Sequence, residues 1–302
     1  MKRHILVTGA SGLVGKQLIS ELLRQGHTVS ALIRSNKPIP GVKTYLWDIY
    51  KDTIDPACIT DADTIIHLAG ESIAGKKWST AYKQQVIDSR VKSTQLLQKL
   101  IRDTNAPVGS FISAAAVGYY GDCGDEILSE TSANGYGFMA ECCAQWEDAI
   151  DKGRRLGMRI VKFRLGVVLS KDGGALASFE KPIRFFTGAP LGSGKQWIPW
   201  VHIDDIVSMF IKALDNTAFN GVYNACAPFP VTNETLTKTI AKTLRRPVWP
   251  FHVPEKVIRM LLGEMSTIVL TSTNTSAQKL LDEGFRFKYT HLEDALAAIY
   301  TK

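Results

Sequence analysis

Apolar and polar positions near the start of the chain follow three successive patterns. Residues 5–15, ILVTGASGLVG, form an apolar run that breaks into glycines, which predicts a strand and then a tight turn. Residues 16–26, KQLISELLRQG, place leucine and isoleucine at helical spacing ahead of Gly26, a residue type that commonly ends a helix. Residues 27–34, HTVSALIR, predict a second buried strand.

The same alternation continues as far as Ser170. Further strands are predicted at 44–48, 63–72, 109–121 and 159–170, and further helices at 79–101 and 137–151. Strands that alternate with helices favour a parallel sheet covered on both faces. We therefore predict an α/β fold, a Rossmann-like doubly wound parallel sheet, with residues 1–170 as its first domain.

A different pattern follows Ser170. Residues 171–200 mix glycine, proline and aromatic residues, which predicts a helix and a long loop that closes over the carboxyl edge of the sheet. Thr232 is a good N-cap for a helix with Leu236 and Ile240 on one face. We predict that residues 171–302 form a smaller substrate-side subdomain.

Length and charge indicate the size of the core and the kind of molecule that the protein binds. A chain of 302 residues can bury a sizeable core, as one large domain or two smaller ones. The formal net charge is +7, but the basic residues occur as scattered pairs. That distribution predicts no nucleic-acid or membrane face. It favours attraction of a small molecule that carries phosphate.

Cysteine usage and the N-terminal residues bear on the compartment. The five cysteines make an odd count without metal-ligand spacing, which predicts reduced thiols in a cytoplasmic protein. The apolar run that follows MKRH is too short for a signal peptide, and no spanning helix is expected.

The first glycine turn predicts a nucleotide site. Gly9 permits the turn, Gly12 lets the backbone approach a pyrophosphate, and Gly15 lets the helix pack against the strand. The N-terminus of the helix adds free N–H groups and a positive dipole end. The residues predicted to bind phosphate are Gly9, Ser11, Gly12, Leu13 and Val14.

The end of the second strand indicates which dinucleotide binds. An NAD site usually has an acidic residue there, but no acidic residue lies between Glu21 and Asp48. Arg34 takes that place, with Lys37 close behind, and a guanidinium suits a 2′-phosphate. NADP is therefore the predicted cofactor, although an ordinary surface arginine is the alternative.

The remaining cofactor contacts are predicted at the carboxyl edge of the sheet. Asp48 is the last residue of the third predicted strand and is placed to face the adenine. Leu68, Ala69, Gly70 and Glu71 lie at the end of the fourth predicted strand, where Ala69 and Gly70 form a turn. Gln85 and Arg90, on the helix that follows, are further candidate contacts to the cofactor. The sequence alone does not show whether their side chains point toward it. His67 lies inside an apolar run, so we expect a core residue.

Five ordered motifs carry a family resemblance: VTGASGLVG, HLAGES, SAAAVGYYG, RLGVVLS and WVHIDD. With them the chain resembles an atypical member of the extended short-chain dehydrogenase/reductase superfamily, in its epimerase/dehydratase branch. HLAGE with KKW and IDSR, AECCAQWE and PLGSGKQWIPWVHIDD are similar to an epimerase-like subfamily sometimes labelled cell-division inhibitor. The resemblance covers essentially the whole chain. It implies a strand near 198–212 that returns to the main sheet, and a C-terminal segment of the family at about 248–300.

The chain departs from this family at the catalytic positions. None of its nine tyrosines has a lysine four residues on. The resemblance places Met139 and Cys143 at the usual Tyr and Lys positions and Ala115 and Ala116 at the Ser/Thr position. The usual Lys lowers the pKa of the Tyr so that it can move a proton, which neither Met nor a neutral thiol does. Cys143 is expected to pack against the cofactor.

Replacement chemistry has several candidates. Tyr119 or Tyr120 could act as an acid beside Glu141, and structural placement of Tyr120 is the alternative. Ser113 and Lys195 are weaker catalytic candidates. Lys195, Gln196, Trp197 and Trp200 suit a sugar or nucleotide ring, or else they only anchor a loop.

Two more segments are predicted to be structural. His202, Asp204 and Asp205 fix the fold, and no metal is expected because HIDD lacks the spacing of known sites. The apolar stripe VIRMLLG, residues 257–263, is predicted core, with a homodimer contact as the alternative.

Two functions remain open from the sequence. One is an NADP-dependent epimerase or oxidoreductase of non-standard mechanism that acts on a nucleotide-sugar or another small molecule. The other is a non-catalytic NADP(H)-binding regulatory or sensor protein.

Overall fold

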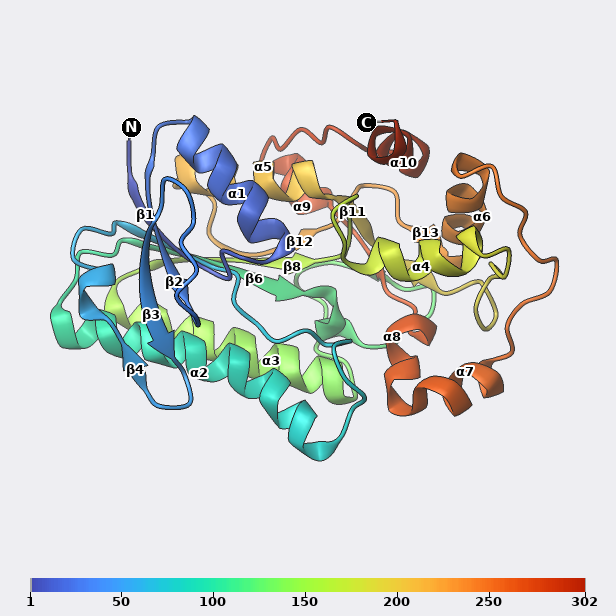
Figure 1. The fold of residues 1–302 in the computed structure, drawn as a ribbon, viewed down its shortest axis with the longest axis horizontal. Helices are drawn as coiled ribbons and strands as arrows, with labels where there is room; N and C mark the ends of the chain where they lie inside the picture. The colour runs from blue at the N-terminus through green and yellow to red at the C-terminus, as the bar shows by residue number, and fades with distance from the viewer. Residues whose placement is uncertain (1, 302) are drawn as a thin grey trace.

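The protein is built around an eight-stranded sheet (Figure 1). The computed structural model describes residues 2–301. The strand order is β12-β8-β6-β5-β1-β2-β3-β4, and all pairs are parallel except β3 with β4. The strands are β1 His4–Thr8, β2 Thr28–Ile33, β3 Lys43–Asp48, β4 Thr53–Ile54, β5 Thr64–His67, β6 Ser110–Ala116, β8 Arg159–Leu165 and β12 Gly221–Ala225. This order confirms the predicted doubly wound α/β fold.

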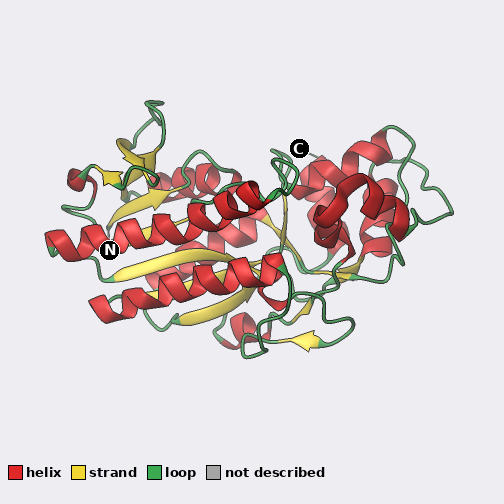
Figure 2. Cartoon of the chain, turned by 90° about the horizontal axis from the view of Figure 1, so that it is seen from below, coloured by secondary structure: helices red, strands yellow, loops and turns green. Residues whose placement is uncertain are grey.

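Helices cover both faces of the sheet. α1 (Leu13–Arg24) and α5 (Ile203–Asp215) pack together on one face, and α2 (Thr80–Thr104) and α3 (Phe138–Asp151) on the other (Figure 1). Figure 2 shows two long helices that lie side by side over the sheet and run nearly along its strands. The strands are buried from both sides, which explains their nearly continuous apolar sequence.

Local sequence fixes the ends of these helices. The Ser79 side chain accepts a hydrogen bond from the Tyr82 N–H and starts α2, and Asn105 ends that helix in the left-handed conformation, with φ of 50°. Short 3₁₀ turns connect several elements: η1 Pro56–Cys58, η2 Val117–Tyr120, η3 Lys152–Leu156 and η4 Gly263–Ser266. Of these, η2 is important for the site because it follows β6 directly.

The second half of the chain has its own apolar core. Trp200, Leu236, Ile240 and Leu296 are members of this cluster and are fully buried. The elements of this half include, besides α5 and β12, β9 Val167–Leu169, α4 Ala175–Arg184, β10 Trp197–Ile198, β11 Trp200–His202, β13 Val231–Thr232, α6 Asn233–Thr243, α7 Glu255–Leu262, α8 Thr267–Leu270, α9 Gln278–Asp282 and α10 Leu292–Tyr300. Leu280 of α9 packs in the core of the main sheet instead. The Thr232 side chain caps α6, as predicted.

Two predictions about this half need correction. Residues 198–212 do not supply a strand to the main sheet, because β11 pairs with β9 and the rest of the segment forms α5. The sheet is completed instead by β12. The stripe VIRMLLG is not core either: in α7 only Ile258 is buried, whereas Met260 is 78% exposed.

A seam of hydrogen bonds joins the two halves. β7 (Ile127–Leu128) pairs with β14 (Asn274–Thr275). The Ser272 Oγ donates to the Gly124 carbonyl, and the Trp197 N–H donates to that same Oγ. These contacts fix the loop after η2 against the second half of the chain.

Within residues 2–301, none of the helices combines the length and the apolar character that crossing a membrane would require.

Candidate functional site

The centre of the candidate site is the turn after β1. Gly9 has φ of 68°, and a Cβ on it would lie 2.6 Å from the Leu68 carbonyl carbon and oxygen. A Cβ on Gly15 would lie 2.3 Å from the Gly9 carbonyl oxygen. Side chains at these two positions would push apart β1, α1 and the turn after β5. The glycines therefore have the packing roles that the sequence predicted.

The N-terminus of α1 is open to a ligand. Its N-cap is Gly12, which supplies no capping side chain, and the first turn contains no acidic residue. The first N–H groups of a helix have no partner within it and carry the positive end of its dipole. Ser11 and Gly12 are exposed, and Leu13 and Val14 are half-buried. This arrangement suits the phosphates of a nucleotide.

A buried polar chain supports the turn after β5. The Thr8 Oγ1 accepts hydrogen bonds from the N–H groups of Leu68 and Ala69, both at 3.1 Å. Its own proton therefore goes to the Nδ1 of His67, 2.8 Å away. The Nε2 of His67 faces the Ser93 and Thr94 hydroxyls at 3.1 and 3.3 Å. His67 is fully buried, which confirms the expectation of a core residue.

This environment makes the stability of the protein dependent on pH. Burial, and secondarily the charge of Arg90, lowers the pKa of His67 from 6.5 to about 3. Below about pH 6.5 the unfolded chain binds a proton that the folded chain does not, so acid favours unfolding. We expect the free energy of unfolding to fall by about 1.4 kcal/mol per pH unit between about pH 6 and pH 5 from this residue alone.

The measurement is urea denaturation over that pH range, for the wild type and for His67→Gln. The variant keeps a side chain that can hydrogen-bond but does not titrate, so its pH dependence should be flatter by about one proton. Equal slopes for the two proteins would contradict a neutral buried His67.

Arg90 supports the turn after β5 from below. Its Nη1 donates to the carbonyl oxygens of Glu71, at 3.1 Å, and Val86, at 3.0 Å, and its guanidinium packs 5.1 Å from the Trp146 ring centroid. The Ser89 hydroxyl accepts from the Glu71 N–H. Gly70 is exposed, and a Cβ on it would lie 3.2 Å from the Arg90 guanidinium carbon. Arg90 therefore holds the shape of the turn, while Gln85 lies exposed on α2.

Arg34 and Asp48 lie at one end of this edge: Arg34 follows β2, and Asp48 is the last residue of β3. The Arg34 Nη1 is 3.4 Å from a Glu71 carboxylate oxygen, and the side chain is 82% exposed. The Asp48 carboxylate accepts from the N–H groups of Tyr50 and Lys51. Arg34 and Asp48 line a cavity of about 410 Å³ together with Leu46, Trp47, Thr53, Ile54 and Asp55. An exposed guanidinium at a cavity rim is available to an anionic ligand.

The first turns of α3 carry Met139 and Cys143, the residues that the family resemblance aligns with the usual catalytic pair. A Cβ on Gly118 of η2 would lie 3.4 Å from the Met139 Cε and 3.6 Å from the Cys143 Sγ. Cys143 is 2% exposed, and burial raises the pKa of its thiol. Such a thiol stays protonated and packs as an apolar group.

Beneath this region lies an ion cluster that we did not predict from the sequence. Arg164 of β8 makes two hydrogen bonds with the Glu147 carboxylate of α3, at 2.7 and 3.0 Å. The Lys162 Nζ is 3.1 Å from Glu147 and 2.7 Å from Asp151. Arg164, Lys162 and Glu147 are each at most 5% exposed. A signal was present: two basic residues stand two apart on a buried strand, and two acidic ones stand four apart on a helix.

Tyr120 is part of this cluster and is 0% exposed. Its hydroxyl accepts from the Arg164 Nη1 at 2.8 Å and lies 2.6 Å from the Asn224 Oδ1. Burial raises the pKa of Tyr120 to about 12. An enclosed hydroxyl with its partners already in place does not reach a ligand, so this geometry corrects the catalytic hypothesis for Tyr120 in favour of the structural alternative.

The other two catalytic candidates are Ser113 and Lys195. The first is not at an open surface, and the second lies on a loop. Ser113 lies in the middle of β6, is 0% exposed, and donates to the Ala114 carbonyl. Lys195 is exposed on the loop between α4 and β10, and its backbone N–H donates to the Ser193 hydroxyl. Neither placement supports proton transfer at the edge of the sheet.

The aromatic loop is anchored, as one of the two interpretations expected. The Gln196 amide donates to the carbonyls of Leu191 and Val269, and the Trp197 indole donates to the Asp125 carboxylate. Trp200 is 0% exposed. These three side chains hold the loop in place.

The HIDD segment starts α5 and is structural. The His202 ring accepts from the Asp204 N–H as the N-cap. Asp205 accepts from the N–H groups of Lys288 and Tyr289, and burial raises its pKa. Throughout residues 2–301 no group of three potential ligands is arranged to hold a metal ion.

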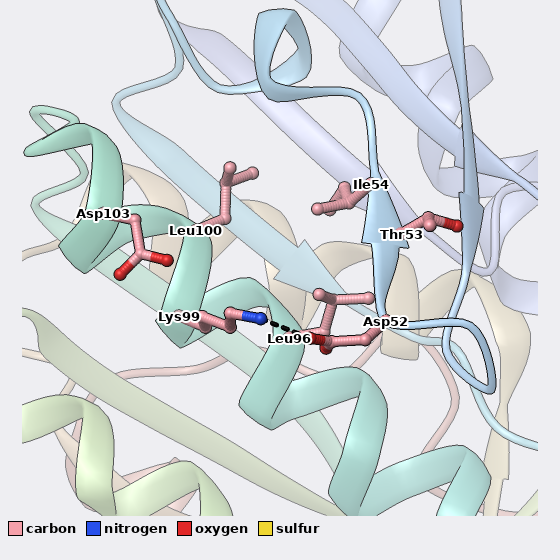
Figure 3. A pocket seen from close by; sticks show the side chains of 7 residues that line it. All are labelled: Asp52, Thr53, Ile54, Leu96, Lys99, Leu100 and Asp103. Carbon is pink, nitrogen blue, oxygen red and sulfur yellow. Dashed lines mark hydrogen bonds and ion pairs between the residues drawn. The ribbon is translucent and has the colours of Figure 1, made fainter.

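A second groove lies between β4 and the C-terminal half of α2 and shares Thr53 and Ile54 with the cavity at Arg34 (Figure 3). It has a volume of about 280 Å³. Lys99 points across it to an ion pair with Asp52, while Leu96 and Leu100 form its apolar side (Figure 3). Because Lys99 and Asp52 pair with each other, neither offers a free reactive group. This groove is therefore not the candidate site.

Two family models match the chain. The NAD dependent epimerase/dehydratase family matches residues 5–226. A domain of unknown function, DUF1731, matches residues 253–299, which lie within the C-terminal segment expected at about 248–300.

Relatives and solved structures agree with these matches. An epimerase family protein, the chloroplastic SDR39U1 homolog of Arabidopsis thaliana, is 35% identical over 98% of this chain and 86% of its own length. Human epimerase family protein SDR39U1, solved with NADPH, is 30% identical, with a TM-score of 0.87 and 99% of each chain covered. A nucleoside-diphosphate sugar epimerase from Corynebacterium glutamicum is 32% identical over 99% of this chain, with a TM-score of 0.81, and this chain spans 58% of that chain.

The UDP-glucuronic acid 4-epimerase of Bacillus cereus shares the fold, with a TM-score of 0.80 at 18% identity. The sheet order, the glycine turn and the matched residues all lead to one conclusion: the chain belongs to the NAD-dependent epimerase/dehydratase family and carries the DUF1731 segment at its C-terminal end.

Proposed function

We propose that this protein binds NADP(H) and acts as an epimerase- or oxidoreductase-like enzyme on a small molecule, by a mechanism without the family's usual catalytic residues. The observation that carries the proposal is the open edge of the sheet, with Gly9 at the turn, uncapped N–H groups on α1, and Arg34 exposed after β2. The human relative solved with NADPH supports it.

The charges at this edge favour the phosphorylated dinucleotide. A ribose without a 2′-phosphate is usually held by a carboxylate at the end of β2, and this chain has Arg34 there. Of the carboxylates around Arg34, Glu71 is the one that pairs with it, and Glu71 lies in the turn after β5 rather than at the end of β2. An incoming 2′-phosphate would replace that exposed, weak ion pair with a charge-assisted one.

The residues of this chain have distinct tasks in the proposed reaction. The turn of Gly9 and Gly12 and the first residues of α1 would hold the pyrophosphate, Arg34 the 2′-phosphate, and Asp48 the adenine. Met139 and Cys143 would fill space beside η2 and exclude water there. A bound nicotinamide would supply hydride transfer.

The substrate class follows only from relatives. Relatives of this fold include a nucleoside-diphosphate sugar epimerase, which supports a nucleotide-sugar or another alcohol or carbonyl compound as substrate. Five free thiols favour a reducing compartment such as the cytoplasm. We also propose that the protein forms a homodimer through the exposed apolar residues of α7.

The missing catalytic residues favour a second candidate function. Ala115, Met139 and Cys143 cannot transfer protons, which is compatible with a regulatory or sensor protein that binds NADP(H) without turnover. A sensor should change a partner interaction or its oligomeric state differently with NADPH and NADP⁺.

A turnover screen separates the two functions. Purified protein is incubated in separate reactions with NADPH and an aldehyde, ketone or quinone, and with NADP⁺ and a UDP-sugar. The change in reduced-nicotinamide absorbance and the formation of epimerised sugar are followed. We expect turnover of at least one class, and Gly9→Val, which should prevent binding, as the inactive control. No turnover with any class, together with different oligomeric states in NADPH and NADP⁺, would favour the sensor.

A further inference from the structure

We propose that Tyr119 is the proton-transferring residue of this protein and replaces the family's Tyr–Lys pair from a different element. The inference rests on the proposed function, since it assigns the proton step of that reaction. It is carried by the position of η2, by the packing of the Tyr119 ring, and by the free state of its hydroxyl.

The backbone places Tyr119 at the reacting end of the sheet. η2 begins directly after β6, between the ends of β5 and β8, which is where a ligand binds in a sheet of this kind. The neighbouring Gly118 lies against Met139 and Cys143, the two residues at the usual catalytic positions. Tyr119 is therefore one residue from the space that the family's catalytic pair lines.

The Tyr119 ring is held in one orientation. The Arg164 guanidinium carbon lies 3.5 Å from its ring centroid, and the Tyr120 ring packs edge-on at 5.5 Å. Arg164 is itself fixed by two hydrogen bonds to Glu147. The Tyr119 carbonyl accepts from the Gly135 N–H at 3.0 Å and from the Asn134 side chain at 2.8 Å. A cation beside a catalytic tyrosine is what the family's lysine provides, and here Arg164 provides it.

The hydroxyl of Tyr119 is available to bind a ligand. Tyr119 is half-exposed, and its hydroxyl makes no hydrogen bond to any of residues 2–301. The Tyr120 hydroxyl is enclosed by Arg164 and Asn224, and the Tyr82 hydroxyl donates to the Ser72 carbonyl. Tyr136 is 96% exposed. Of these four tyrosines, Tyr119 is the one that combines a ring packed on a cation with a hydroxyl free of hydrogen bonds to residues 2–301.

The proposed step balances in both directions. In reduction, a hydride from NADPH forms a C–H bond at the substrate carbonyl carbon, and the C=O π pair moves to oxygen. That oxygen takes the Tyr119 hydroxyl proton, which gives an alcohol, NADP⁺ and a phenolate that regains its proton from water. In oxidation, the phenolate removes the alcohol proton as the hydride leaves.

The first test compares Tyr119→Phe with the matched variant Tyr136→Phe. The probe is an ortho-quinone, a general carbonyl acceptor for hydride from NADPH. General acid catalysis contributes about 10²- to 10⁴-fold, so we expect kcat of Tyr119→Phe to fall by about a hundredfold or more. The Kd for NADPH and the KM should change by less than about threefold. Tyr136→Phe should match the wild type in all three constants.

The same assay separates this inference from the proposed function. An active wild type with an equally active Tyr119→Phe variant would overturn the role of Tyr119 and leave the proposed function standing. A wild type that binds NADPH but reduces neither the quinone nor any compound of the screen would overturn both.

A second measurement needs no turnover. N-Acetylimidazole acetylates accessible tyrosine hydroxyls, and peptide mass spectrometry locates them. We expect Tyr119 and Tyr136 to be acetylated in the free protein and only Tyr119 to be protected by saturating NADPH, with Tyr120 unmodified throughout. Acetylation of Tyr119 at the same rate with and without NADPH would place its hydroxyl away from the cofactor and overturn the inference.

Discussion

Replacing Glu147 with glutamine is expected to lower the free energy of unfolding by about 3–5 kcal/mol, the usual cost of removing one partner of a buried ion pair. Glu147 is the carboxylate between Arg164 and Lys162, and all three side chains are nearly inaccessible to water. Glutamine has nearly the same volume, so the loss would come from charge rather than from a cavity. Urea denaturation, with a check that the slope is unchanged, measures it.

A double variant distinguishes charge from packing. Glu147→Leu combined with Arg164→Met removes both charges, while Lys162 keeps its partner Asp151 at 2.7 Å. Contacting residues couple by about 0.5–3 kcal/mol, so the double variant should lose less stability than the sum of the two single variants. Additive losses would mean that the ion pair contributes no more than the packing of its two side chains.

Replacing Arg34 with alanine is expected to weaken NADPH binding by about ten- to a hundredfold, or roughly 1.5–3 kcal/mol, since a charge-assisted contact to the 2′-phosphate is lost. NADH lacks that phosphate, so its affinity should change little. The matched control is Lys37→Ala, which removes an exposed positive charge three residues away. Raising the salt concentration should weaken the wild-type preference for NADPH, because the guanidinium is exposed.

The sheet and the nucleotide turn could be predicted from the sequence because both depend on local patterns. Apolar runs such as residues 27–34 are buried from both sides, and the glycines at 9 and 15 have no room for a Cβ. Arg34 could be found because the position after β2 follows from the end of an apolar run. Predicting these features requires no knowledge of contacts between distant segments.

The parts that could not be predicted depend on contacts between distant segments. Residues 200–202 have the composition of a buried strand, but they pair with β9, and β12 occupies the place beside β8. The apolar residues of α7 have helical spacing, which does not reveal whether another element covers them. Tyr119 and Tyr120 are adjacent in the sequence and have different environments only because Arg164, Glu147 and Asn224 come from three other elements.

We propose above all that the edge of the sheet binds NADPH through Arg34. The most direct measurement is a paired titration of the wild type and Arg34→Ala with NADPH and NADH, followed by tryptophan fluorescence, because Trp47 lines the same cavity as Arg34. The account predicts tight NADPH binding by the wild type, a ten- to hundredfold loss in the variant, and little change for NADH. Equal affinities of the wild type for both nucleotides, or no binding of either, would contradict it.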